Sequence, residues 1–173
     1  MKRSSTLFVV GIVSVLALGG QGAIPGDVLN PSVVADRVVI GKIAHRLSLM
    51  NHGKPVRTYK VALGSQLNLP KERQGDGRTP EGLYIIDGRN ASSAFHRALH
   101  ISYPNVADRA RATAGGFAPG GDIMIHGIRN GLGWIGSLHR IFDWTKGCIA
   151  VTDGEIEEIW NAVPNGTVVE IKP

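Results

Sequence analysis

The sequence contains little of what marks several common protein classes. Aromatic residues make up 6% of the 173 residues, and cysteine occurs once. The one long apolar stretch covers residues 7–18, which excludes a protein with several membrane spans. The 23 glycines follow no Gly-X-Y period and point to turns instead of long helices, which excludes a collagen and a coiled coil. Length and composition together indicate one turn-rich domain that contains β-structure.

Strong charge of one sign is also missing. The net charge is +5 at pH 7, and two of the positive residues, Lys2 and Arg3, lie in the N-terminal leader. The other positive residues form no basic stripe and no nucleic-acid-binding motif, so we expect no nucleic-acid partner. A mild positive charge fits an exported protein near an anionic polymer such as the cell wall.

The first residues are typical of a secretory leader. The positive start is followed by the apolar residues 7–18 and by small residues over 19–23. Such a stretch is short for a membrane span but suits a signal peptide. We predict a signal peptide over residues 1–22, either cleaved or retained as an anchor, and a linker over residues 23–35. The expected location is the periplasm or cell envelope, with no stable membrane partner beyond an uncleaved leader.

The rest of the chain, residues 36–173, shows mainly strand patterns. Alternating or continuous apolar runs separated by turn residues predict strands over 37–40, 44–50, 56–63, 83–86, 99–103, 123–125, 149–151 and 167–171. A short helix is expected over 106–114, and a capping box from Thr152 to Glu155 predicts the start of another. The fold class is therefore mostly β, a single β-rich α+β domain with two or three short helices.

Cys148 is the residue on which the chemistry depends. A lone cysteine in an exported chain forms no internal disulfide, and it is either a small buried apolar residue or a reactive thiol. His126 ends one apolar strand, and Cys148 begins another after Gly147. Adjacent strands would bring the two side chains together, and a histidine in reach gives a thiol thiolate character. Gly147 permits a tight turn, from which the N–H groups of Gly147 and Cys148 can face a developing oxyanion.

These residues carry a resemblance to a known family. His126-Gly127, followed by Thr145-Lys146-Gly147-Cys148, is similar to the signature of L,D-transpeptidases of the YkuD type, which is a histidine, a spacer and Ser/Thr-His-Gly-Cys. The resemblance includes GDGRTPEG at residues 75–82 and covers about residues 36–173. The segment DWTKGCIAV at 143–151 resembles a DWTxGCIAV sub-branch. The family's second histidine is Lys146 here, and the Asn or Arg usual two residues after the cysteine is Ala150.

The resemblance implies a β-sandwich catalytic domain and acyl transfer on peptidoglycan stem peptides. Cys148 would attack the diaminopimelate carbonyl of a tetrapeptide donor, release the terminal D-Ala and form a thioester that an amine acceptor resolves. His126 would act as general base and acid, oriented by the carbonyl of Gly127. The N–H groups of Gly147 and Cys148 would form part of the oxyanion hole. This chemistry needs no metal and no cofactor.

Four further residues are candidates for substrate binding. They are Thr145 in the signature, His139 and Trp134 in the spacer, and Arg78 in the 75–82 segment. A guanidinium can hold a carboxylate with two hydrogen bonds, although a charged loop tip is the commoner role. His139 either lines the cleft, replaces the missing second histidine or is structural. No zinc-site spacing links the histidines.

Two alternatives to transpeptidation remain open. The same dyad would also serve a hydrolase, an L,D-carboxypeptidase or an amidase, if water resolved the thioester. A non-catalytic cell-wall binding module that keeps the fold is the second alternative, and an unreactive buried Cys148 would favour it.

Overall fold

The computed structural model describes residues 29, 30, 32–67 and 69–173. The predicted signal peptide over 1–22 lies outside the described residues, as do residues 23–28 and 31 of the predicted linker. Ala35, the last residue of that linker, is buried and donates its N–H to the Ala162 carbonyl at 2.8 Å, so it packs as part of the domain. Within the described residues, no helix has both the length and the apolar character to cross a membrane.

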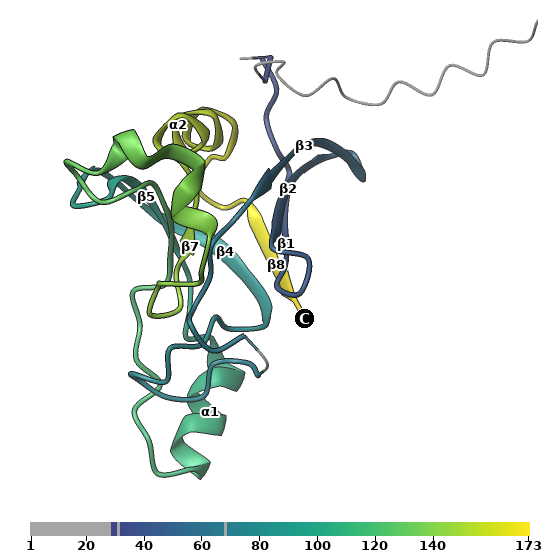
Figure 1. Ribbon diagram of the computed structural model, residues 1–173. Helices are drawn as coiled ribbons and strands as arrows, with labels where there is room; N and C mark the ends of the chain where they lie inside the picture. Colours follow the sequence, from purple (N-terminus) through teal and green to yellow (C-terminus); the bar gives the residue numbers. More distant parts are fainter. Residues whose placement is uncertain (1–28, 31, 68) are drawn as a thin grey trace, which may run out of the picture.

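The described residues form one mixed eight-stranded sheet in the order β3-β2-β1-β8-β4-β5-β6-β7 (Figure 1). The pairs β1–β8 and β6–β7 are parallel, and the other pairs are antiparallel. In chain order the strands are β1 (Arg37–Gly41), β2 (Arg46–Asn51), β3 (Lys54–Lys60), β4 (Gly82–Ser93), β5 (His96–Ile101), β6 (Met124–His126), β7 (Ile149–Ala150) and β8 (Val168–Lys172).

Three helices accompany the sheet in the described part of the chain: α1 (Val106–Ala114), the 3-10 helix η1 (Gly133–Arg140) and α2 (Asp153–Ala162). Figure 1 shows α1 and α2 at opposite ends of the molecule. Both begin with a capping box, from Asn105 to Asp108 in α1 and from Thr152 to Glu155 in α2. The mostly β class with short helices is confirmed.

The long strand β4 joins the two halves of the sheet. Its first residues, Gly82 to Ile85, pair with β8, and the residues from Ile86 onward pair with β5. The register shifts between Ile86 and Gly88 and again between Asn90 and Ser93. Such bulges bend a strand and increase its twist, so β4 redirects the sheet and lets both halves share one core.

That core consists of the apolar residues that alternate along the strands. Buried pairs such as Leu47 and Leu49 in β2 come from one half, and Ile125 and Ile149 come from the other. The helix α2 adds Ile156 and Ile159 to the same cluster, as its helical spacing predicted.

The chain beyond β3 connects the two ends of this sheet. Ala62 exchanges two backbone hydrogen bonds with Ala150, at 3.0 and 2.8 Å, and Gly64 forms a bridge to Thr145. The residues that follow β3 therefore lie directly beside the turn that carries Cys148.

Candidate active site

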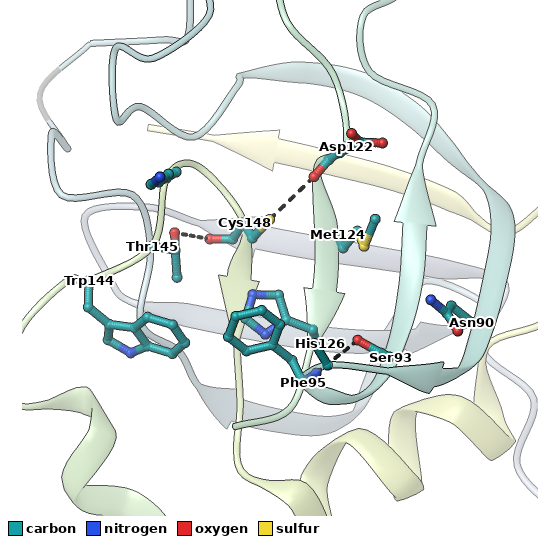
Figure 2. A pocket seen from close by; sticks show the side chains of 11 residues that line it. Asn90, Ser93, Phe95, Asp122, Met124, His126, Trp144, Thr145 and Cys148 are labelled. Carbon is teal, nitrogen blue, oxygen red and sulfur yellow. Dashed lines mark hydrogen bonds between the residues drawn. The ribbon is translucent and has the colours of Figure 1, made fainter. Parts of the chain in front are cut away.

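The pairing of β6 with β7 places Cys148 beside His126. The strands run parallel with Ile125 opposite Ile149, and Cys148 lies immediately before β7. Because side chains alternate along a strand, Ile125 and Ile149 enter the core while Met124, His126 and Cys148 share the other face. All three line one cavity (Figure 2).

That cavity has a volume of about 500 Å³ and opens between the β4–β5 hairpin and the turn before β7. It is lined by Asn90, Ser93, Ala94, Phe95, Asp122, Met124, His126, Trp144, Thr145, Lys146 and Cys148. Of the residues predicted from the sequence, the cavity thus brings together Cys148, His126 and Thr145.

The His126 ring is held in one tautomer. Its Nδ1 lies 2.7 Å from the Gly127 carbonyl, and a carbonyl only accepts, so Nδ1 carries the proton and Nε2 is left as an acceptor. Burial lowers the pKa of His126 because the charged ring loses solvation, and the hydrogen bond to Gly127 only partly offsets this. A side chain at Gly127 would put its Cβ 2.7 Å from Asp153 Oδ1, so the close packing behind the ring requires glycine.

Two aromatic rings pack against His126. Its ring centroid lies 4.6 Å from that of Phe95 and 5.8 Å from that of Trp144, and these two rings stack at 6.0 Å. Figure 2 shows the Phe95 ring directly over His126. Phe95 comes from the tip of the β4–β5 hairpin, and nothing in its local sequence indicated a role at the site.

The environment of the Cys148 thiol favours its neutral form. Burial raises its pKa, which outweighs the lowering by the Met124 backbone N–H. The thiol donates to the Asp122 carbonyl at 3.4 Å. Burial thus favours the neutral form of both groups, a thiol and an imidazole.

Gly147 shapes the turn before Cys148. Its φ is +124°, and a Cβ there would lie 2.5 Å from the Arg78 carbonyl oxygen. Any residue with a side chain would therefore be strained and would collide with the backbone of the 75–82 segment.

Thr145 braces this turn from inside. Its hydroxyl donates to the Cys148 carbonyl at 2.7 Å and accepts from the Gly147 N–H at 3.1 Å. The Gly147 N–H was predicted to face an oxyanion. In the structure it donates a hydrogen bond to the Thr145 hydroxyl instead. The Gly147 N–H therefore already has a partner within the turn, and the oxyanion hole stays a prediction.

The structure does not bring Arg78 or Trp134 to the cavity. The Arg78 guanidinium pairs with Glu72 at 3.1 Å, and only its backbone contacts the nucleophile turn, at Gly147. Trp134 lies on η1 with 81% of its surface exposed. Neither side chain is among those that line the cavity.

His139 lies behind Trp144, with ring centroids 6.4 Å apart. It is buried, and neither ring nitrogen has a hydrogen-bond partner among the described residues. Burial, reinforced by the positive charge of Arg140, lowers the pKa of His139 to about 4. His139 therefore supports the aromatic wall and does not itself line the cavity.

The 75–82 segment is a rigid support for the site. Asp76 accepts from the Glu72, Arg73 and Arg78 N–H groups and from the Lys71 ammonium at 2.8 Å. Burial alone would raise the pKa of Asp76, but these donors outweigh it and bring the pKa down to about 2. The segment thus fixes the Arg78 backbone that contacts Gly147.

Comparison with known families matches this arrangement. The sequence profile of YkuD, the L,D-transpeptidase catalytic domain, matches residues 35–171. The chain belongs to the L,D-transpeptidase catalytic domain family. The finer DWTxGCIAV sub-branch stays a prediction.

Individual relatives agree with the family. YafK of Escherichia coli (strain K12), provisionally named an L,D-transpeptidase, is 31% identical over 113 residues, which are 64% of this chain and 38% of YafK. YkuD of Bacillus licheniformis, named in the same provisional way, is 26% identical over 157 residues, 89% of this chain and 76% of that protein. The crystal structure of the helical cell shape determining protein Pgp2 of Campylobacter jejuni superposes with a TM-score of 0.60 at 26% identity, over 78% of this chain and 46% of Pgp2.

Some of these relatives are longer proteins, of which the matched region is only a part. The chain spans about two-fifths of YafK and under half of Pgp2.

Among the described residues, no group of three or more His, Cys, Asp or Glu side chains is arranged to hold a metal ion.

Proposed function

We propose that this L,D-transpeptidase domain is a cysteine acyltransferase that forms L,D-linkages on peptidoglycan stem peptides. The observation that carries the proposal is the placement of Cys148 and His126 on one face of adjacent parallel strands, both lining one cavity. The Gly127 carbonyl fixes the imidazole so that Nε2 is the basic atom. We place the enzyme in the periplasm or cell envelope, with residues 36–173 as its catalytic domain.

The first half-reaction forms a thioester. His126 Nε2 takes the thiol proton while Cys148 Sγ attacks the diaminopimelate carbonyl of a tetrapeptide donor. The amide bond to the terminal D-Ala then breaks, and the same proton passes from His126 to the leaving amine. Because burial favours the neutral form of both groups, the proton transfer from the thiol to His126 accompanies the attack on the carbonyl.

The developing oxyanion needs a donor close to the sulfur. The Cys148 N–H takes this role, since Thr145 accepts the Gly147 N–H. Thr145 therefore supports the reaction indirectly, because it holds the turn from which the Cys148 N–H projects.

The second half-reaction resolves the thioester. An amine of a neighbouring stem peptide gives its proton to His126 and attacks the thioester carbonyl, which restores the Cys148 thiol and forms the new amide. Water in place of the amine would give a shortened stem peptide and a hydrolase.

Mass spectrometry of the protein with a disaccharide-tetrapeptide tests the proposal. We expect an adduct on the wild-type protein that lacks the mass of D-Ala, and no adduct on Cys148→Ala. We expect His126→Gln to slow adduct formation by about 100-fold or more, while His52→Gln, a change on the exposed β2–β3 turn, leaves it unchanged.

The released products separate the outcomes. A cross-linked dimer supports transpeptidation, and a tripeptide stem supports the hydrolase. Wild-type protein that is folded but forms neither adduct nor product would overturn the proposal in favour of a wall-binding module.

A further inference from the structure

The cavity holds two charged side chains among its lining residues. Lys146 and Asp122 are both exposed, and His126 is kept neutral by burial. Within the described part of the chain, neither the Lys146 ammonium nor the Asp122 carboxylate takes part in an ion pair or a side-chain hydrogen bond. A cation and an anion are thus both available to a ligand.

The two charged residues come from different segments of the chain beside the nucleophile. Asp122 contacts Cys148 directly, since its backbone carbonyl accepts from the thiol at 3.4 Å. Figure 2 shows Asp122 on the side of Cys148 away from Thr145 and Trp144. Lys146 follows Thr145 in the chain, two residues before Cys148, and its side chain lines the same cavity.

The walls between these charges are largely apolar. Phe95, Met124 and Trp144 line the cavity close to Cys148. A ligand carboxylate has Lys146 as its cationic partner here, and a ligand ammonium has Asp122 as its anionic partner. A ligand with negative charge alone would be attracted by the Lys146 ammonium and repelled by the Asp122 carboxylate.

From this placement we infer that Lys146 and Asp122 select the donor by two charges on opposite sides of the amide that Cys148 attacks. Lys146 binds the free carboxylate of the leaving C-terminal residue. Asp122 binds the side-chain ammonium of the residue whose carbonyl is attacked. The inference rests on the proposed acyl transfer and adds the charges that decide which stem peptides are donors.

A double comparison of variants and ligands tests this, with binding as the readout. The Cys148→Ala protein is titrated with three tetrapeptides: the native one, one amidated at its C-terminus and one acetylated on its side-chain amine. We expect each modification to weaken binding about two- to fivefold, the range for ion pairs of exposed side chains. Using Cys148→Ala removes any influence of Asp122 on the thiol.

Lys146→Met and Asp122→Asn are then introduced separately. We expect Lys146→Met to abolish the preference against the amidated peptide and to keep the preference against the acetylated one. Asp122→Asn should do the reverse, and asparagine tolerates the positive φ of 54° at this position. Lys60→Met, on the exposed end of β3, is the matched control and should change neither preference.

Each outcome decides the inference. Variants that weaken all three peptides equally, or none, overturn it. A tetrapeptide with lysine in place of diaminopimelate should bind like the native peptide, because it keeps the ammonium. If Lys146→Met instead affects only peptides with a side-chain carboxylate, the assignment of Lys146 to the terminal carboxylate is wrong. Since binding is measured without turnover, these results are independent of whether Cys148 forms an adduct.

Discussion

Thr145 shows how much of the site depends on one hydroxyl group. It satisfies the Gly147 N–H and the Cys148 carbonyl at once, from a buried position. Replacing it with valine keeps the shape but leaves these backbone groups without a partner. We expect Thr145→Val to lower the free energy of unfolding by about 2 kcal/mol and to slow adduct formation. Urea unfolding measures the first effect, and Thr145→Ser, which keeps the hydroxyl, should restore most of both.

The burial of His126 has a consequence for the pH dependence of the reaction. The pKa of His126 lies below its ordinary value of 6.5, so the ring stays neutral and able to accept a proton at pH values where a free imidazole is already protonated. We therefore expect the acid limb of kcat/KM to lie below pH 6.5. An NMR titration of the His126 ring in Cys148→Ala protein checks the assignment, and a midpoint at or above 6.5 in both measurements would contradict it.

The residues that we propose as catalytic could largely be identified from the sequence, and the residues that surround them could not. Cys148 and His126 were predicted because each ends or begins an apolar run, and their placement on adjacent strands agrees with that hypothesis. Phe95 and Asp122 reach the cavity from turns whose positions depend on distant strand pairing. The Arg78 side chain was a candidate for binding a substrate carboxylate because of its chemistry. In the structure it forms an ion pair with Glu72 in the same loop.

Among the elements, β4 differs most from its prediction. The apolar residues at 83–86 predicted a short strand, and the strand extends to Ser93. The second part is polar and exposed because it projects as a hairpin with β5, so its pairing depends on backbone bonds and not on an apolar pattern. The helix α2, by contrast, was predictable, because its capping box and apolar spacing are local signals. The helix α1 was also predicted, but the 3-10 helix η1 was not.

The turn before Cys148 packs closely against the backbone of the 75–82 segment. Gly147→Ala forces a Cβ to within 2.5 Å of the Arg78 carbonyl at a φ of +124°. We expect a loss of about 3 kcal/mol or more in the free energy of unfolding, together with loss of the adduct. Gly154→Ala is the control, because nothing lies within 4 Å of its Cβ in α2 and alanine favours helix by about 0.5–1 kcal/mol. A Gly147→Ala protein as stable as wild type would contradict the assigned role.

For the whole molecule, Asp76 predicts how stability changes in acid. Its pKa is about 2 in the folded protein and 3.8 ordinarily, so the folded state favours the ionised carboxylate. This stabilisation is present above pH 4 and is lost as the pH falls toward 2. We expect Asp76→Asn to lower the free energy of unfolding at pH 7 by about 2 kcal/mol or more, because it also leaves the buried Lys71 ammonium without its anionic partner.

The difference between wild type and Asp76→Asn should shrink as the pH falls from 4 to 2, which urea unfolding at several pH values would show. Glu72→Gln, a change of an exposed carboxylate in the same loop, is the control and should alter stability by less than about 0.5 kcal/mol at any of these pH values. A constant difference across the range would show that Asp76 acts through its shape and not through its charge.

The order of the strands in the sheet could not be predicted from the sequence. Apolar alternation assigns a residue to the core or to solvent, as it did for Leu47 and Leu49. It does not say which strand becomes the neighbour of which. The insertion of β8 between β1 and β4 pairs the C-terminal residues with the first strand, and no local signal encodes that pairing.

The junction between the chain after β3 and the turn before β7 determines when, during folding, the turn that carries Cys148 is assembled. The Leu63 N–H donates to Asp143 Oδ1 across 80 residues, and the Thr145 N–H donates to the Leu63 carbonyl at 3.1 Å. Contacts between residues so far apart in the sequence have a high entropic cost of loop closure and therefore form slowly. Labelling Cys148 with a thiol reagent during refolding should therefore show the thiol protected only in the last phase. Under the proposed export and acyl transfer, a chain that is still being translocated would carry an unassembled nucleophile, and acyl transfer would begin only after translocation is complete.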